Sequence, residues 1–246
     1  MCFDVIFIWQ SSFEEKSNTE LEKRMNNLHF FENRIKTIKA HFQHEFTGYQ
    51  NRGQIAKDSD IHEASTYGPL GIAHAKEFQQ TVDKLKPNIP STIHVIDIGC
   101  GYALSRAVLK DSGVNYKSYY GFDPNESMLW FAKQIDGEGK FFSSLDQLPV
   151  FRDHVLVIIN HVFGQDSVSQ ADICSWVSNL KRSCNAGFTL MSIEIDGFLP
   201  AARNFTLFRR FIKSMNLCVQ NEVEYRIQGQ HKNNKIIRQW NLRSAA

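Results

Sequence analysis

The sequence has few cysteines, and none of them are closely spaced. Its 246 residues include five cysteines, an odd number, and no two of these form a Cys-x-x-Cys pair. Disulfide frameworks are typical of short secreted chains with an even number of cysteines, so this count predicts a reducing, cytoplasmic environment. No group of cysteines and histidines has the spacing of zinc ligands, and we therefore predict no metal site.

Long apolar runs and several catalytic motifs are also missing. The apolar stretch MCFDVIFIWQ at the start is much shorter than the ~20 residues that a membrane helix needs, and it lacks the basic leader of a signal peptide. We expect this stretch to form an extra strand or an apolar segment packed on a domain, and we expect no membrane partner. The absence of GxxxxGK[ST], HExxH and GxSxG argues against a nucleotide phosphate loop, a zinc protease of that type and a serine-hydrolase elbow.

The net charge of +2 is small and unevenly distributed. Residues 1–90 are nearly neutral, residues 91–200 are acidic, and residues 201–246 carry 9 basic and 2 acidic groups. The scattered positions of the basic groups favour a solvated helix and edge strands that are protected from aggregation by charge. A basic surface that faces an anionic substrate is the alternative interpretation.

The N-terminal third of the sequence has the periodicity of helices. Thr19 and Glu22 have the spacing of a capping box, and apolar residues then recur every three or four positions as far as Phe42. A second apolar stripe of this kind runs from Ile72 to Leu85 and ends before two prolines. Such helices either pack on a core or form a lid over a substrate.

The rest of the sequence alternates between strands and helices, which predicts an α/β fold with a doubly wound, mostly parallel sheet. The runs at 93–98 and 155–159 are continuously apolar, as expected for strands buried on both faces. We therefore predict a helical N-terminal extension, residues 1–90, followed by an α/β domain, residues 91–246. The expected strands are Ile93–Ile98, 119–122, Lys140–Phe142, 155–159, Phe188–Ile195, 217–225 and 236–242, and the expected helices are 104–110, 126–134, 172–181 and 205–215.

The segment VIDIGCGYA places two glycines between a buried strand and a helix. Gly99 and Gly101 permit a tight turn and let a ligand approach the backbone, and the amides at the start of the helix suit a carboxylate or phosphate. A dinucleotide fingerprint would have glycine or alanine at Leu104. Methyltransferases that use S-adenosylmethionine instead have an acid two residues before the first glycine, followed by GxGxG. Asp97 matches that acid and Ala103 stands at the third glycine, so the second pattern is favoured.

An acidic residue follows the next predicted strand at a suitable distance. Asp123 lies 24 residues after Gly99, in the segment YYGFDPNESMLWFAK. A carboxylate at the end of this strand can accept hydrogen bonds from both hydroxyls of a ribose, as it does in dinucleotide-binding folds. The alternative is a helix cap, because Asp is also favoured at that position. The order of strand, acid and helix favours ribose binding.

From Ile93 to about Ile195, the chain resembles the class I S-adenosylmethionine-dependent methyltransferases. VIDIGCGYA resembles the glycine motif of the family, GFDPNESML its acidic motif, FFSSLDQLP its third motif and VLVIINHVFGQ its fourth strand with the following loop. The resemblance implies a Rossmann-like sheet of seven strands in which the last strand is antiparallel. It also implies that S-adenosyl-L-methionine is the cofactor.

The resemblance assigns a set of residues to the cofactor site. Cys100 between the two glycines contributes its backbone, and its thiol is not expected to be a nucleophile because nothing nearby lowers its pKa. Ser144 stands where the family usually has the acid that meets the adenine amine, so a hydroxyl or a backbone amide would replace that contact. The residues implied to border the cofactor are Asp97, Gly99, Cys100, Gly101, Asp123, Pro124, Met128, Ser144, Leu145 and Asn160.

The loop Asn-His-Val-Phe that follows the fourth strand is the candidate for the acceptor side. Ligands of open α/β sheets bind beyond the carboxyl ends of the strands, so this loop is expected to face the transferred methyl group. It resembles in part the Asn/Asp-Pro-Pro-aromatic motif of nucleic-acid amino-methyltransferases, without the prolines. We predict that Asn160 orients a substrate amine, that Phe163 stacks on a flat ring and that His161 acts as a base. Alternatively, Asn160 and His161 satisfy local backbone groups.

The predicted function is therefore S-adenosylmethionine-dependent methyl transfer to an unidentified small molecule, RNA or protein. One alternative is an rRNA methyltransferase, because DIHEASTYGPL is similar to a stretch of the enzymes that confer aminoglycoside resistance. That stretch lacks the charged motif of those enzymes, and the neutral N-terminal section does not favour RNA binding. The other alternative is a non-catalytic scaffold that binds S-adenosylmethionine.

Overall fold

The computed structural model describes residues 69–86, 89, 93–101, 103–135, 138–165, 167–184, 187–228 and 234–244. The chain divides into two compact units, Met1–Ile72 and Ala73–Ala246, and the fold described below is that of the second unit. Three sequence features lie outside the described residues: the segment MCFDVIFIWQ, the helix expected between Thr19 and Phe42, and nearly all of DIHEASTYGPL. The role of residues 1–90 as a lid or a substrate section stays a prediction.

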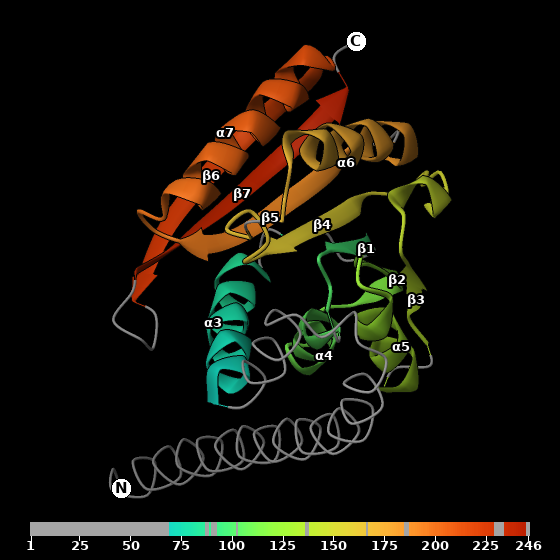
Figure 1. The fold of residues 1–246 in the computed structure, drawn as a ribbon, viewed down its shortest axis with the longest axis vertical. Helices are drawn as coiled ribbons and strands as arrows, with labels where there is room; N and C mark the ends of the chain where they lie inside the picture. Colours follow the sequence, from blue (N-terminus) through green and yellow to red (C-terminus); the bar gives the residue numbers. More distant parts are fainter. Residues whose placement is uncertain are drawn as a thin grey trace, which may run out of the picture. The chain divides into compact units, whose positions relative to one another are not determined.

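A seven-stranded mixed sheet forms the centre of the second unit (Figure 1), in the order β3-β2-β1-β4-β5-β7-β6. The first five strands in the chain are parallel, whereas β7 lies antiparallel between β5 and β6. This arrangement confirms the predicted fold class, including the antiparallel last strand. The strands are β1 (Ile93–Ile98), β2 (Tyr116–Phe122), β3 (Lys140–Phe142), β4 (Val155–Asn160), β5 (Phe188–Ile195), β6 (Leu217–Gln228) and β7 (Asn234–Ser244).

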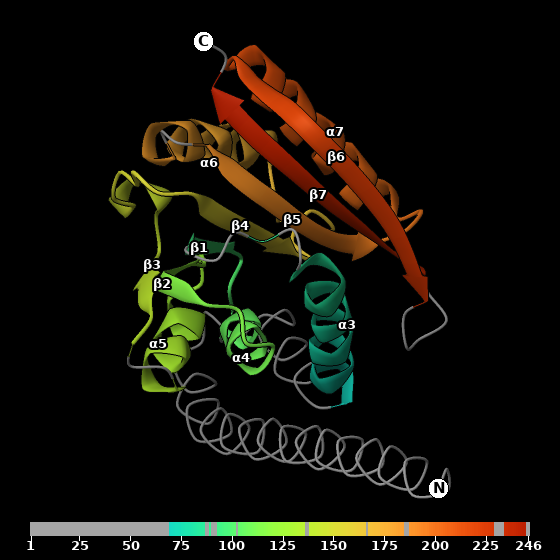
Figure 2. The same ribbon diagram turned by 180° about the vertical axis from the view of Figure 1, so that it is seen from behind.

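Helices cover both faces of the sheet, as Figures 1 and 2 show from opposite sides. On one face lie α3, α4 and α5, and on the other lie α6 and α7. None of the described helices is both long and apolar enough to cross a membrane. The helices are α3 (Pro69–Leu85), α4 (Leu104–Asp111), α5 (Glu126–Ile135), α6 (Gln170–Ser183) and α7 (Leu199–Ser214), with a short 3₁₀ turn, η2 (Leu145–Gln147).

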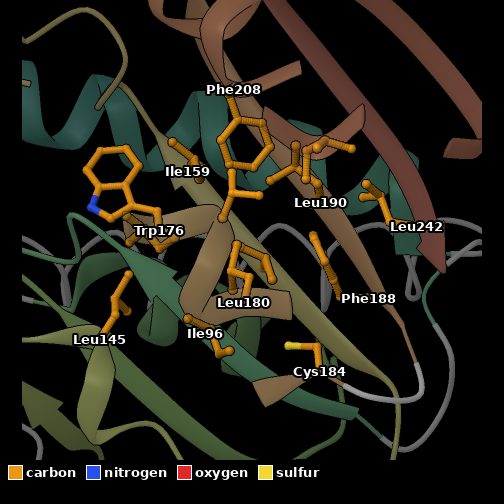
Figure 3. Packing of buried hydrophobic residues seen from close by; sticks show 14 of the residues in the cluster. Ile96, Leu145, Ile159, Trp176, Leu180, Cys184, Phe188, Leu190, Phe208 and Leu242 are labelled. Carbon is orange, nitrogen blue, oxygen red and sulfur yellow. The ribbon is translucent and has the colours of Figure 1, made fainter. Parts of the chain in front are cut away.

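A large hydrophobic core lies between the sheet and the helices α6 and α7 (Figure 3). Alternate residues of the central strands point to this side, and the two helices bring the apolar stripes that cover them. Helix α6 begins at a capping box, in which Ser169 and Asp172 each accept a hydrogen bond from the other's backbone amide. The residues labelled in Figure 3 are Ile96, Leu145, Ile159, Trp176, Leu180, Cys184, Phe188, Leu190, Phe208 and Leu242.

Because β1, β2, β4 and β5 are parallel, their carboxyl ends meet at one edge of the sheet. The first residues of β7 reach the same edge, since Lys235 pairs with Ile195 at the end of β5. Sequence segments that are far apart in the chain therefore converge there. This edge holds the candidate site.

Candidate active site

The loop after β1 is a tight turn whose backbone requires glycine. Gly99 has φ +72° and Gly101 has φ +48°, and Ala103, at the place of the third glycine, also has a left-handed backbone with φ +59°. The amides of Gly99 and Cys100 both donate to the carbonyl of Phe122, at 2.8 and 2.9 Å. The last residue of β2 thereby holds the glycine loop in place through two backbone hydrogen bonds.

Gly99 is also required by the close approach of the loop after β4. A Cβ atom at this position would lie 2.4 Å from Cγ2 of Val162, which is far inside van der Waals contact. The two loops therefore pack against each other at the carboxyl edge of the sheet. Any side chain at residue 99 would separate them.

Asp123 connects the end of β2 to the glycine loop. One carboxyl oxygen accepts the amide of Gly101 at 3.0 Å, and the other accepts the amide of Asn125 at 2.9 Å. Burial raises the pKa of Asp123, and these two amide bonds act against that rise. A carboxylate has about four acceptor sites, so two bonds leave further capacity for ligand hydroxyls.

The helix-cap alternative for Asp123 can be compared directly with its neighbour. Helix α5 begins at Glu126, and Oδ1 of Asn125 accepts the amide of Met128 at 3.4 Å. Asn125 therefore lies at the cap of α5, and Asp123 lies two residues before it. The carboxyl of Asp123 binds both the glycine loop, through the amide of Gly101, and the cap residue, through the amide of Asn125.

Asp97 lies beneath the loop and is 1% exposed. The hydroxyl of Tyr119 donates a short hydrogen bond to its carboxyl group. Burial raises the pKa of Asp97 to about 7, against the lowering effect of hydrogen bonds from Tyr119 and Ser105. Next to it, burial raises the pKa of the Cys100 thiol, and the nearby carboxyl groups add to the effect. A thiol in this environment stays protonated and is a poor nucleophile.

The other residues implied by the resemblance lie in different environments. Pro124 is exposed after β2, whereas Met128 on the first turns of α5 is only 1% exposed. Ser144 is half-buried at the start of η2, and its side chain makes no capping hydrogen bond. Leu145 packs into the large hydrophobic core on the side of α6 (Figure 3). Contact between these four residues and a cofactor stays a prediction.

The loop after β4 brings the two predicted acceptor-side residues to the same edge. Asn160 is the last residue of β4, and its buried Oδ1 has no hydrogen-bond partner among the described residues. His161 has a left-handed backbone with φ +57°, and its amide donates to the carbonyl of Ile193 on β5 at 2.8 Å. The backbone amide of His161 is thus satisfied by β5. The preceding residue, Asn160, has a side-chain oxygen that can still accept a hydrogen bond.

The predicted role of Phe163 as a stacking surface for a substrate is wrong. Its side chain is completely buried, and its ring contacts Trp176, Phe205 and Phe208 in the core. Because the loop turns after His161, this side chain points away from the carboxyl edge into the helix layer. Its carbonyl accepts a hydrogen bond from the buried side chain of Asn204 on α7 at 2.8 Å.

A carboxyl group that the sequence analysis missed holds this loop in place. Glu194 on β5 is 2% exposed, and the backbone amides of Phe163, Gly164 and Val162 donate to it, the first at 2.9 Å. Burial raises the pKa of Glu194 to about 8, although these amides lower it. A charged residue inside the apolar strand FTLMSIEI was the sequence signal that pointed to it.

Two further charged residues next to His161 were also missed. Glu77 on α3 and Lys235 on β7 are both buried, and their charged groups lie 3.6 Å apart. The same carboxyl oxygen lies 3.9 Å from Nε2 of His161. The sequence signal for Glu77 was its position on the face of α3 that is buried, together with Thr81 and Leu85. A charged residue on a buried helix face indicates a buried partner.

The His, Cys, Asp and Glu side chains in the described part of the chain do not gather into a set of metal ligands. No group of three or more His, Cys, Asp or Glu side chains there is arranged to hold a metal ion.

Comparison with solved structures identifies the fold. A SAM-dependent methyltransferase from Leishmania major matches with a TM-score of 0.52 at 12% identity, over 87% of this chain and 82% of that chain. The described chain has the class I methyltransferase fold. A candidate RNA methyltransferase from Pyrococcus horikoshii has a TM-score of 0.46 at 16% identity over 70% and 83% of the two chains. The N-methyltransferase NodS from Bradyrhizobium japonicum has 0.46 at 12% over 68% and 96%.

No protein-family model and no curated protein matches the sequence. The class I methyltransferase fold is therefore established by the sheet order and the structural match. In this fold the glycine loop, Asp123 and the loop after β4 lie along one edge, and the residues present there fit an adenosyl ligand by their donor and acceptor chemistry. The open acceptor capacity of Asp123 and the buried Oδ1 of Asn160 are the observations behind that fit.

Proposed function

We propose that this protein is an S-adenosylmethionine-dependent methyltransferase with a small molecule, RNA or protein as its acceptor. The observation that carries the proposal is the carboxyl group of Asp123, which ends β2 and binds the amide of Gly101 in the glycine loop. This hydrogen bond holds the carboxyl group of Asp123, which can bind ribose hydroxyls, next to the glycine loop, whose backbone a ligand can approach closely. The fold and the sequence resemblance support the same assignment.

Each residue at the edge has a proposed role. Asp123 accepts the ribose hydroxyls, and the glycine loop passes beneath the ligand without a side chain in between. When bound, S-adenosylmethionine would supply a methyl group activated by its sulfonium, with the neutral thioether as the leaving group. Asn160 offers its buried Oδ1 to an N–H or O–H of the acceptor, which the loop holds in line for reaction.

His161 is the proposed base on the acceptor side. Burial lowers its pKa below 6.5, so the ring is neutral at pH 7 and has a lone pair to accept a proton. A base is required only when the acceptor must lose its proton early. We therefore expect His161 to affect turnover and not cofactor affinity.

The two alternatives are an rRNA methyltransferase and a non-catalytic scaffold that binds S-adenosylmethionine. Several basic groups of the C-terminal region form ion pairs, such as Arg209 with Glu222 and Arg226 with Asp196, which leaves fewer of them for an RNA backbone. A non-catalytic scaffold would explain the cofactor residues but would give no role to His161. Both alternatives remain outcomes of the experiment below.

The experiment combines titration calorimetry with a radiolabelled methyl-transfer screen. We expect the protein to bind S-adenosylmethionine and its demethylated product, and to label one class among RNA, protein and metabolite extracts. Asp123→Asn retains an oxygen for the Gly101 amide but loses the charge, and it should weaken binding about 100-fold, because hydrogen bonds to charged groups contribute about 1.5–3 kcal/mol each. Asp153→Asn, an exposed carboxyl at the opposite edge near the start of β4, is the matched control.

The outcomes separate the candidate functions. Unchanged affinity in Asp123→Asn would refute the ribose assignment, and no binding by the unaltered protein would refute the proposed function. Binding without label in any extract would favour the scaffold. Label on RNA that is lost steeply with increasing salt would select the RNA methyltransferase.

A further inference from the structure

A cluster of three titratable side chains adjoins the acceptor side of the site and consists of Glu77, His161 and Lys235. The three side chains come from three separate elements: α3, the loop after β4 and the start of β7. Their side-chain exposures are 3%, 17% and 6%, respectively. Burial of opposite charges together is costly unless they are paired, and here the ammonium of Lys235 lies 3.6 Å from the carboxyl of Glu77.

The imidazole of His161 faces this pair with one specific nitrogen. Nε2 lies 3.9 Å from Oε2 of Glu77, which is within ion-pair range and longer than a hydrogen bond. A carboxylate that faces one ring nitrogen favours the proton on that nitrogen, because N–H points its positive end at the negative charge. The other nitrogen, Nδ1, then carries the lone pair.

We propose that Glu77 is a positioning residue that holds the ring proton of His161 on Nε2 and leaves Nδ1 as the nitrogen that accepts a proton from the methyl acceptor. The inference rests on the proposed function, because it requires His161 to act as the base. The ammonium group of Lys235 compensates the negative charge of Glu77. The imidazole of His161 can therefore stay neutral next to this carboxylate. Helix α3 thus belongs to the acceptor side of the site.

The charged groups around His161 act on it in opposite directions. Burial is the main reason that its pKa is lowered, Lys235 lowers it further, and Glu77 raises it. From β5, the carboxyl of Glu194 binds the amides of the next three residues of the loop and not the ring. Glu77 on α3 and Lys235 on β7 therefore shift the pKa of the ring in opposite directions.

A purely structural role would leave a different signature. If the Glu77–Lys235 pair only docked α3 on the sheet, its removal would change stability and leave the proton distribution of His161 intact. The decisive readout is therefore the state of the ring. Nitrogen-15 NMR of the imidazole reports directly which nitrogen carries the proton, and a pH titration of the same signals gives the pKa.

The experiment uses three variants and one control, with signals assigned by the loss of one set in His161→Asn. In Glu77→Gln we expect the pKa of His161 to fall by about half a pH unit or more, and in Lys235→Met we expect it to rise by a similar amount. The double variant Glu77→Leu/Lys235→Met leaves no buried charge without a partner, and in it we expect the Nε2–H preference to give way to a mixture of tautomers. Asp83→Asn removes an exposed carboxyl from the same helix and should change nothing.

Opposite shifts in the two single variants support the inference. Shifts in the same direction, or an unchanged tautomer in the double variant, would overturn it. Calorimetry with S-adenosylhomocysteine on the same samples keeps the two proposals distinguishable. Failure of the unaltered protein to bind would count against the proposed function, whereas normal binding with an unperturbed ring would count against the role of Glu77 alone.

Discussion

Asp97 and Glu194 are buried acids whose environment favours the protonated form. For Asp97, burial raises the pKa from 3.8 to about 7, and hydrogen bonds from Tyr119 and Ser105 only partly oppose this. The folded protein therefore binds this proton more tightly than the unfolded chain does. The stabilisation is complete below about pH 4 and is lost as the pH rises towards 7.

The substitution Asp97→Asn should make stability less dependent on pH. We expect the unfolding free energy of the unaltered protein to fall between pH 5 and 7, by up to about 1.4 kcal/mol per pH unit for this one proton. Asp97→Asn, which cannot ionise, should have a shallower slope, whereas the exposed control Asp146→Asn should keep the original slope. Urea denaturation at pH 5, 6 and 7 measures this, and equal slopes in all three proteins would show that Asp97 is not a buried acid.

Local sequence identified some of the site residues and could not identify others. Gly99 and Asp123 are visible because their roles depend on the neighbouring backbone: a positive φ, a strand end and a following helix. Glu77 and Lys235 meet only because α3 and β7 converge on the loop after β4. Phe163 was misjudged because a partial motif gave its position in the loop but not the direction of its side chain.

At the scale of elements, the loops after β1 and β4 depend on each other. Gly99 has a positive φ, and a Cβ atom added there would lie 2.4 Å from a methyl carbon of Val162. Gly197 has a similar φ of +76°, but a Cβ atom added there would have no atom within 4 Å. A left-handed backbone costs a residue with a Cβ about 1–2 kcal/mol. Of these two positions, Gly99 alone adds the cost of steric overlap between the new Cβ and Val162, about 1–3 kcal/mol.

We therefore expect Gly99→Ala to lower the unfolding free energy clearly more than Gly197→Ala does. The measurement is chemical denaturation of both variants at one pH. Val162→Ala in the Gly99→Ala background should recover part of the difference, because it removes the methyl that overlaps with the new Cβ. Equal losses in the two single variants, or no recovery in the double variant, would contradict the close packing of the two loops.

The bounds of several elements differ from the sequence expectation for physical reasons. Helix α7 begins at Leu199 and not at 205. Pro200 lies in its first turn, where backbone amides have no partner within the helix, so the missing N–H of proline costs no hydrogen bond. The first turn also exposes Leu199, so no apolar stripe marked it. Strand β6 extends to Gln228 because β7 pairs with it along nearly its whole length, which sequence periodicity alone does not indicate.

At the scale of the whole molecule, the parallel strands explain why the site lies where it does. The order β3-β2-β1-β4-β5-β7-β6 brings the carboxyl ends of β1, β2, β4 and β5 to one edge, and the antiparallel strand β7 begins at this edge and adds Lys235. Buried apolar runs sufficed to predict the central strands β1, β4 and β5. The family resemblance implied seven strands with the last one antiparallel, but the order of the strands was not predicted, because composition and periodicity do not specify neighbours.

The proposed function requires an adenosyl ligand at that edge. The most direct test is a crystal structure of the protein grown with S-adenosylhomocysteine. We expect its ribose hydroxyls on the carboxyl group of Asp123, its remaining chain along the loop that holds Gly99 and Gly101, and its sulfur towards Asn160 and His161. Density for the ligand elsewhere, or an edge closed by side chains of the protein itself, would contradict the account.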